Sequence, residues 1–178
     1  MRVLFGGSFD PVTIGHMHLI RRISALAEHV VVAVMINPGK KAAFSREERV
    51  AFLKEACREL GNVTVVSHTG LLVECAKQYQ ADAVVRGVRP LGDFESEFHM
   101  AHINKMLSGI ETILLTADDE YAYISSSIVR EIASFGGDIS KMVPPGLAGS
   151  IQAALANNKR EQTDNREDAG EHFEGKGN

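Results

Sequence analysis

A glycine-rich segment near the start of the chain carries the side chains best suited to chemistry on a phosphate. It runs from Gly6 to His16 and reads Gly-Gly-Ser-Phe-Asp-Pro-Val-Thr-Ile-Gly-His. Glycine lets the backbone approach an anion closely, and a helix N-terminus presents unpaired N–H groups and the positive end of a dipole. Thr13 and His16 add a hydroxyl and an imidazole at the same place. An imidazole there can act on a phosphate that is reacting, beyond binding one.

Further cations, hydroxyls and glycines follow the other apolar runs of the chain. Lys40 and Lys41 come after the second run, residues 86–89 (Arg-Gly-Val-Arg) after the fourth, and residues 121–127 (Tyr-Ala-Tyr-Ile-Ser-Ser-Ser) after the fifth. The third run is followed by Leu71-Leu72, which predicts an apolar wall. Ligands bind outside the carboxyl ends of the strands in open parallel sheets, so we expect all these groups on one rim.

Each of these groups also has a plainer interpretation. Gly6-Gly7 could be only a tight turn, Lys40-Lys41 a solvated pair, and the serines 125–127 an ordinary helix N-cap. Glu97 suits a solvated helix face as well as it suits a site. We favour the functional interpretation of the loops because four of the five carry groups that suit a phosphate. The remaining histidines lack such a context and are expected to be structural or exposed: His18, His29, His68, His99 and His102.

Strand-like and helix-like segments alternate along the chain. The apolar, β-rich runs are residues 3–5, 30–36, 63–66, 83–85 and 112–115. Helical periodicity covers residues 16–28, 45–60, 72–80, 94–107 and 126–135. This alternation predicts an α/β fold: one Rossmann-like, doubly wound domain over residues 1–156, with a five-stranded parallel sheet and helices on both faces. Residues 157–178 are rich in polar and charged residues, which predicts a disordered tail.

The composition excludes several classes of function. The chain has 178 residues and a formal charge of −4, which argues against nucleic acid as a general partner. No apolar run is long enough to span a membrane and no signal peptide is present, so we expect a cytoplasmic protein. Cys57 and Cys75 are far apart and lack metal-ligand spacing, which favours two reduced thiols in the core and no protein metal site.

The chain shows no nucleophilic serine, Cys-His pair or carboxylate dyad. A site made of cations, backbone donors and one imidazole suits phosphoryl or nucleotidyl transfer. In such reactions the protein mainly positions the reactants and stabilises the charge that develops.

Several motifs together resemble a known family. Residues 7–16 are similar to the signature of the nucleotidyltransferases with a T/H-x-G-H motif, with Thr13 at its first position. Pro38-x-Lys40-Lys41, residues 86–89, Asp93-Phe94-Glu95-x-Glu97 and residues 124–127 extend the likeness to the bacterial phosphopantetheine adenylyltransferases, from about Met1 to Ala156. The resemblance implies transfer of the adenylyl group of ATP to 4′-phosphopantetheine, giving dephospho-coenzyme A and pyrophosphate. It also implies Mg²⁺, a homohexamer and coenzyme A as a feedback ligand.

The resemblance also implies a role for each matching residue. His16, Lys40 and Arg89 would be catalytic. ATP would be held by Ser8, Phe9, His16, Gly87, Val88, Arg89, Glu97, Tyr121, Ala122, Tyr123, Ile124, Ser125, Ser126 and Ser127. The acceptor would be held by Ser8, Lys40, Leu72 and Arg86.

The chain departs from the family pattern without losing a charged group. Gly6 stands where many members have Pro, Ile14 replaces a frequent Asn, Ser96 replaces an aromatic residue, and Tyr121 stands where Trp is frequent. Two other functions compete with this interpretation. An adenylyltransferase for nicotinate mononucleotide is disfavoured by Thr13 and by residues 86–89. A non-catalytic nucleotide-binding module would not need His16, Lys40 and Arg89 together.

Overall fold

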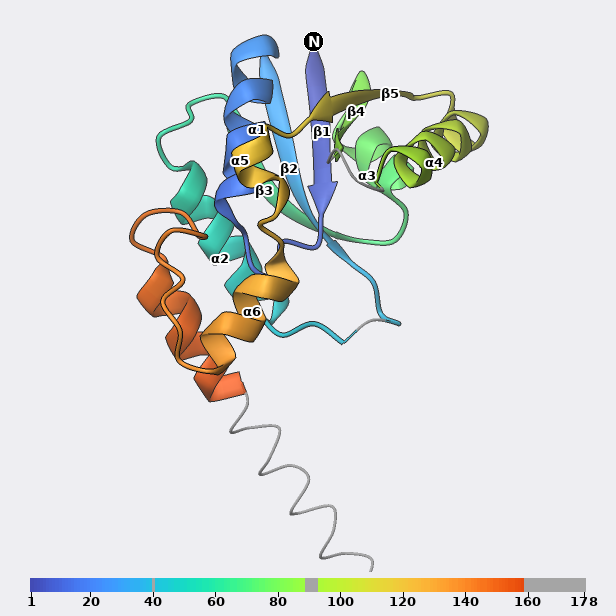
Figure 1. The fold of residues 1–178 in the computed structure, drawn as a ribbon. Coiled ribbons are helices and arrows are strands. Elements are labelled where there is room, and N and C mark those ends of the chain that lie inside the picture. Colours follow the sequence, from blue (N-terminus) through green and yellow to red (C-terminus); the bar gives the residue numbers. More distant parts are fainter. Residues whose placement is uncertain (40, 89–92, 159–178) are drawn as a thin grey trace, which may run out of the picture.

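A computed structural model of the chain describes residues 1–39, 41–88 and 93–158, and it has an α/β fold (Figure 1). Five parallel strands form one sheet in the order β3-β2-β1-β4-β5. The strands are β1 (Arg2–Gly7), β2 (His29–Ile36), β3 (Val63–Thr69), β4 (Ala83–Val88) and β5 (Glu111–Thr116). The prediction of a parallel α/β sheet is therefore confirmed.

Helices cover both faces of the sheet, as the sequence predicts (Figure 1). They are α1 (Ile14–Leu26), α2 (Arg46–Cys57), α3 (Leu72–Gln78), α4 (Asp93–Ser108), α5 (Asp119–Ala122) and α6 (Ser126–Ser134). Residues 148–158 are also helical. Helices α1, α2 and α6 lie on one face, and α3 and α4 lie on the other.

The central strands are buried on both faces because their side chains alternate between two apolar clusters. Val3 and Phe5 of β1 pack with α1, α2 and the C-terminal helix, whereas Leu4 packs with α3. Val30 and Val32 of β2 follow the first pattern, and Val31 follows the second. Burial on both sides explains why these strands appear in the sequence as continuous apolar runs.

The structure differs from the sequence-based elements in a few places. Strands β1, β3 and β4 extend two or three residues beyond the predicted carboxyl end, and β2 and β5 each start one residue earlier than predicted. Residues 86–88 therefore lie inside β4, where the sequence suggested a loop. Tyr121 and Ala122 lie in the short helix α5, which the periodicity did not indicate. The predicted domain boundary at residue 156 falls inside the last helix, and the tail beyond residue 158 lies outside the described residues. No helix in the described part of the chain is long and apolar enough to cross a membrane.

Candidate active site

Strands β1 and β4, which are neighbours in the sheet, separate at its carboxyl end, and a crevice opens between them. Strand β1 pairs with β4 only from Val3 to Phe5, opposite Ala83 to Val85. Beyond that point Gly6 and Gly7 remain paired with β2, and residues 86–88 remain paired with β5. The strand order reverses at this same junction, which is where ligands bind in doubly wound sheets.

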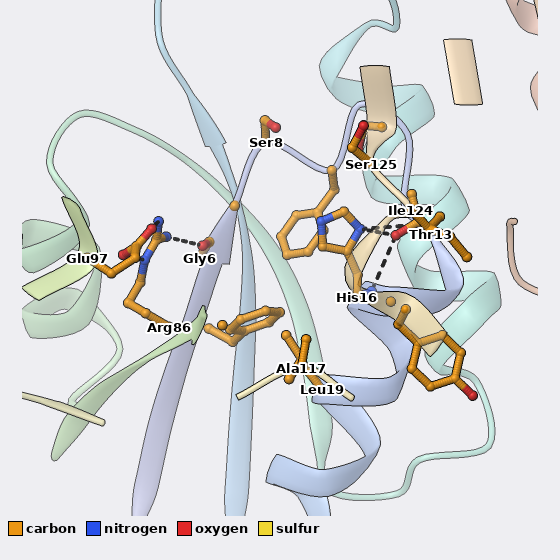
Figure 2. A pocket seen from close by; sticks show the side chains of 17 residues that line it. Gly6, Ser8, Thr13, His16, Leu19, Arg86, Glu97, Ala117, Ile124 and Ser125 are labelled. Atoms are coloured by element: carbon orange, nitrogen blue, oxygen red, sulfur yellow. Dashed lines mark hydrogen bonds and ion pairs between the residues drawn. The ribbon is translucent and has the colours of Figure 1, made fainter. Parts of the chain in front are cut away.

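A cavity of about 320 Å³ lies over this crevice (Figure 2). Its wall comes from the end of β1, the start of α1, β4, α4 and the segment between β5 and α6. The lining residues are Phe5, Gly6, Gly7, Ser8, Phe9, Thr13, Gly15, His16, Leu19, Arg86, Gly87, Glu97, Ala117, Tyr121, Ile124, Ser125 and Ser126. Gly87 allows Leu19 of α1 to pack closely against β4, because a Cβ at this position would meet Leu19 Cδ1 at 2.3 Å.

His16 is oriented by the residue that caps its own helix. Thr13, which is buried, accepts a hydrogen bond from the His16 N–H through Oγ1 at 3.3 Å, and the Thr13 N–H donates to His16 Nδ1 at 3.0 Å. Because Nδ1 accepts from a backbone N–H, the neutral ring carries its proton on Nε2. The imidazole therefore presents a hydrogen-bond donor on the side that lines the cavity.

Phe9 packs against the imidazole ring of His16. Its ring is buried and meets the His16 ring edge to face, with the centroids 5.0 Å apart. The Phe9 backbone has φ +45°, in the left-handed region that is rare for a bulky side chain. Such a conformation costs on the order of 1–3 kcal/mol and persists where the surroundings enforce it, often at functional sites. The loop thus stores strain where it places Ser8 and His16.

Arg86 and Glu97 form a closed pair on the opposite side of the cavity (Figure 2). Arg86 donates from Nε and Nη2 to the two Glu97 carboxylate oxygens, both at 2.7 Å. Its Nη1 donates to Gly6 O at 2.8 Å. Gly6 lies just past the last β1–β4 pair, so the guanidinium reaches across the crevice between the two strands. Arginine binds phosphate through the same fork of N–H groups, so a phosphate at Arg86 must compete with Glu97.

A second polar cluster, which the sequence analysis missed, supports the segment after β5. His18 Nε2 lies 3.1 Å from Asp118 Oδ2, and Arg22 Nη1 lies 3.3 Å from Asp118 Oδ1. The His18 ring also lies against the Tyr121 ring, with centroids 4.6 Å apart. A hydrogen bond to Glu120 raises the pKa of Tyr121 above its ordinary value. His18 therefore supports a residue that lines the cavity, which its sequence context did not indicate.

The structure brings most of the expected site residues together. The described ones that line the cavity are Ser8, Phe9, His16, Arg86, Gly87, Glu97, Tyr121, Ile124, Ser125 and Ser126. Five others lie outside its lining: Leu72, Val88, Ala122, Tyr123 and Ser127. Leu72 lies behind Gly6, where a Cβ on that glycine would meet Leu72 Cδ1 at 2.3 Å. Lys40 and Arg89 lie outside the described residues.

Within residues 1–39, 41–88 and 93–158, no group of three or more His, Cys, Asp or Glu side chains could hold a metal ion. Glu97 is the carboxylate that lines the described cavity, and it is bonded to Arg86. Mg²⁺ is commonly held by substrate phosphates, waters and one or two carboxylates. The donor set of the cavity therefore suits an ion that arrives on a polyphosphate.

A sheet crevice with an oriented imidazole, an arginine and a helix N-terminus defines a nucleotidyltransferase type of site. The sequence model of the cytidylyltransferase-like family matches residues 4–132. Among solved structures, a putative nicotinate-nucleotide adenylyltransferase from Vibrio parahaemolyticus has a TM-score of 0.60, with 87% of this chain and 97% of that one covered. Its sequence identity is 17%, so this likeness shows the fold alone.

Curated relatives narrow the class further. A phosphopantetheine adenylyltransferase from Nocardioides sp. is 46% identical over 87% of this chain and 98% of its own length. Those from Synechocystis sp. and Thermobifida fusca are 47% and 44% identical, over 85% and 87% of this chain and 96% and 94% of their own lengths. The chain belongs to the phosphopantetheine adenylyltransferase family.

Proposed function

We propose that the protein transfers the adenylyl group of ATP to 4′-phosphopantetheine, with dephospho-coenzyme A and pyrophosphate as products. An oxygen of the acceptor phosphate attacks the α-phosphorus of ATP in line. The bond from the α-phosphorus to the bridging oxygen breaks, and its electron pair leaves on pyrophosphate. The observation that carries this proposal is the cavity geometry: His16 offers a fixed N–H donor on one side and Arg86 lies on the other, over the crevice of the sheet.

The residues divide naturally between the two substrates. Arg86, with Lys40 and Ser8, would hold the acceptor phosphate, and Leu72 would face the pantetheine arm. The N-terminus of α6, with Ser125 and Ser126 in the cavity wall, suits the phosphates of ATP. The acceptor phosphate is already an anion, so the reaction needs no strong base.

Charge stabilisation is then the main catalytic task. His16 Nε2 would donate to the α-phosphate as negative charge develops on its oxygens. Loss of one such donor typically costs about 100- to 1,000-fold in rate. Mg²⁺ would enter with ATP and neutralise charge on the triphosphate. Among the described residues, Glu97 is the one carboxylate that lines the cavity.

The proposed assembly is a homohexamer. Helix α4 exposes several large apolar side chains: Phe94, Phe98, Met100, Ile103, Met106 and Leu107. Exposed apolar surface of this extent on a helix marks an interaction site. Substitution of Phe98 by Glu is expected to convert the assembly to smaller species in light scattering after gel filtration, whereas a hexamer that persists would place the interface elsewhere.

Two further expectations accompany the reaction. Coenzyme A carries the phosphopantetheine portion of the acceptor, so we propose that it binds the same cavity and inhibits. We also propose a cytoplasmic location, since Cys57 and Cys75 are free thiols and reduced cysteines suit that compartment.

The test is pyrophosphate release with ATP and Mg²⁺, with 4′-phosphopantetheine and nicotinate mononucleotide compared as acceptors. We expect release with phosphopantetheine alone. Release with the mononucleotide alone would keep the mechanism and overturn the acceptor. Release with neither would support a binding module without catalysis.

A further inference from the structure

We infer that Asp10 and Arg130 act as a pair of positioning residues that fix the spacing between the glycine-rich loop, the segment after β2 and the start of α6. The inference rests on the proposed function, because its purpose is to hold the two substrate-binding sides of the cavity in register. Neither side chain is among the residues that line the cavity.

Asp10 joins two loops that are far apart in the sequence. Its carboxylate is buried and accepts from the Ala43 N–H at 3.0 Å and from the Phe44 N–H at 3.0 Å. Hydrogen bonds from backbone N–H groups to a carboxylate are charge-assisted and stronger than neutral ones. Asp10 is two residues from Ser8, and Ala43 is three residues from Lys40 in the sequence. The Asp10 side chain therefore joins the glycine-rich loop to the backbone of the segment after β2.

Arg130 connects this junction to α6. Its Nη1 lies 3.4 Å from Asp10 Oδ2 and also donates to the Asp10 carbonyl oxygen. Its Nη2 donates to Ser127 Oγ at 3.3 Å, in the first turn of α6. A buried carboxylate is costly unless it is paired, so the guanidinium also stabilises the charge that binds the loop.

Other polar contacts close the same junction. Arg49, which is buried, donates from Nη1 to Ser8 O at 3.1 Å, and Ser126 Oγ donates to Pro11 O at 2.8 Å. Asn158 Nδ2 donates to Ala43 O at 3.0 Å. These polar contacts between the loops can be removed one at a time by substitution. Asp10 makes more of the contacts than Arg49, Ser126 or Asn158 does.

This arrangement matters because adenylyl transfer depends on alignment of two phosphates. A misplacement of about 1 Å by a residue remote from the chemistry can cost about 100-fold in rate. If Asp10 lets the segment after β2 move, the acceptor side of the cavity loses its alignment to His16. Binding of ATP, whose proposed contacts lie on the other loops, is then affected much less.

The principal test is Asp10→Asn, which keeps the shape of the side chain but removes the charge and one of the two acceptors. We expect kcat/KM for phosphopantetheine to fall about 30- to 100-fold, with a higher KM and a lower kcat. The dissociation constant for ATP should stay within about twofold. Hydrogen exchange at the Ala43 and Phe44 amides should become faster.

The pairing itself is tested with Arg130→Gln and Arg130→Lys. Arg130→Gln should reproduce the loss of Asp10→Asn, whereas Arg130→Lys, which keeps a cation beside the carboxylate, should recover most of the activity. The double variant Asp10→Asn/Arg130→Gln should lose no more than either single variant, because residues that act as a unit are not additive.

Asn62→Ala is the matched control for a purely structural effect. Asn62 Nδ2 donates to the Ser24 and Ala27 carbonyls at 2.8 and 3.0 Å, away from the cavity. We expect it to lower the melting temperature and leave KM and kcat unchanged. An Asp10→Asn enzyme that melts earlier yet keeps the wild-type KM and kcat would overturn the inference.

Failure of the proposed function gives a different result. The unchanged protein would then release no pyrophosphate with phosphopantetheine, whatever happens to the variants. Amide exchange at Ala43 and Phe44 reports on the junction in either case, and unchanged exchange in Asp10→Asn would overturn the inference by itself.

Discussion

Thr13 and His16 cap each other: the threonine hydroxyl accepts from the His16 N–H, and the imidazole accepts from the Thr13 N–H. This reciprocal pair both starts helix α1 and fixes the ring of the residue proposed to act on the α-phosphate. The helix dipole, the unpaired N–H groups and the imidazole therefore share one rigid unit, and no reorganisation is needed when charge develops.

Removal of the imidazole should separate binding from turnover. We expect His16→Ala to lower kcat about 100- to 1,000-fold while ATP affinity stays within a few-fold, because the donor acts mainly on developing charge. Single-turnover rates and calorimetric titration of ATP measure the two quantities. Equal losses in affinity and turnover would give His16 a binding role only.

Thr13→Val is the companion variant. It keeps the backbone N–H that donates to His16 Nδ1, so it should lower the free energy of unfolding by about 1 kcal/mol and change activity little.

The Arg86–Glu97 pair predicts opposite effects from its two members. Glu97→Gln should free the guanidinium and tighten binding of phosphopantetheine by about threefold to tenfold, because removal of a competing charge is worth about 1 kcal/mol. Arg86→Met should weaken the same binding at least tenfold. Calorimetric titration with phosphopantetheine in the absence of ATP measures the affinity of each variant. Weaker acceptor binding in Glu97→Gln would mean that the carboxylate contacts the acceptor itself.

Glu48 predicts a pH dependence of stability. Burial alone would raise the pKa of this carboxyl, but hydrogen bonds from Asn158 and from Ser45 outweigh burial and lower it. A lowered pKa in the folded state gives stability that is present above the unfolded value, near 4.5, and is lost as the pH falls through the folded value. Glu48→Gln should therefore cost about 0.5 kcal/mol at pH 7 and nothing at low pH.

Urea unfolding at pH 7 and at low pH measures this difference. Glu47→Gln is the control, because it removes the same charge from the same helical turn. An equal cost for both variants at pH 7 would mean that the helix dipole alone is responsible and that the hydrogen bonds from Asn158 and Ser45 add nothing.

The two cysteines should be inert in the folded protein. Burial raises the pKa of Cys57 to about 11 and that of Cys75 to about 11. At pH 8 about one thiol in a thousand is then ionised, and the thiolate is the reactive form. A thiol-specific dye should label both residues in urea and neither under native conditions. Rapid labelling of one native thiol would show that local opening exposes it.

The tail is expected to be dispensable. The three relatives described above are covered over 94 to 98% of their own length by matches of 152 to 155 residues, whereas this chain has 178 residues. A chain that ends at residue 158 should keep its melting temperature and its rate of pyrophosphate release. Retention of Asn158 is essential to the comparison, because this residue contacts Ala43 and Glu48. Loss of activity on truncation would assign a function to the tail.

The sequence predicts the sheet well because its signals are local. Continuous apolar, β-branched runs such as residues 30–36 are typical of strands buried on both faces. The Ser45/Glu48 capping box marks the start of α2. Helix α5 was missed because four residues carry no periodicity. The end of β4 was placed too early: Arg86 and Gly87 leave β1 but keep their pairing with β5, and a strand that loses one neighbour has no distinct pattern.

The site is predictable as a set of residues and much less as a set of contacts. Residue type and spacing alone indicate the glycine turn, His16 and the serines at 125–127. The hydrogen bonds between Arg86 and Glu97 join a strand to a helix, and His18 contacts Asp118, which lies 100 residues later in the sequence. Such pairs depend on how the helices pack on the sheet, which no local pattern contains.

Because Gly6 and Gly7 lie inside β1, the active site should unfold only when the whole domain unfolds. These residues belong to the most central strand, which pairs with β2 through Gly7 and is buried on both faces. Segments of this kind exchange their amide hydrogens only through global unfolding. The part of the cavity formed by β1 is therefore not expected to unfold locally. Heat should abolish activity and tertiary structure at one temperature, and a ligand that fills the cavity should raise that temperature for the entire molecule.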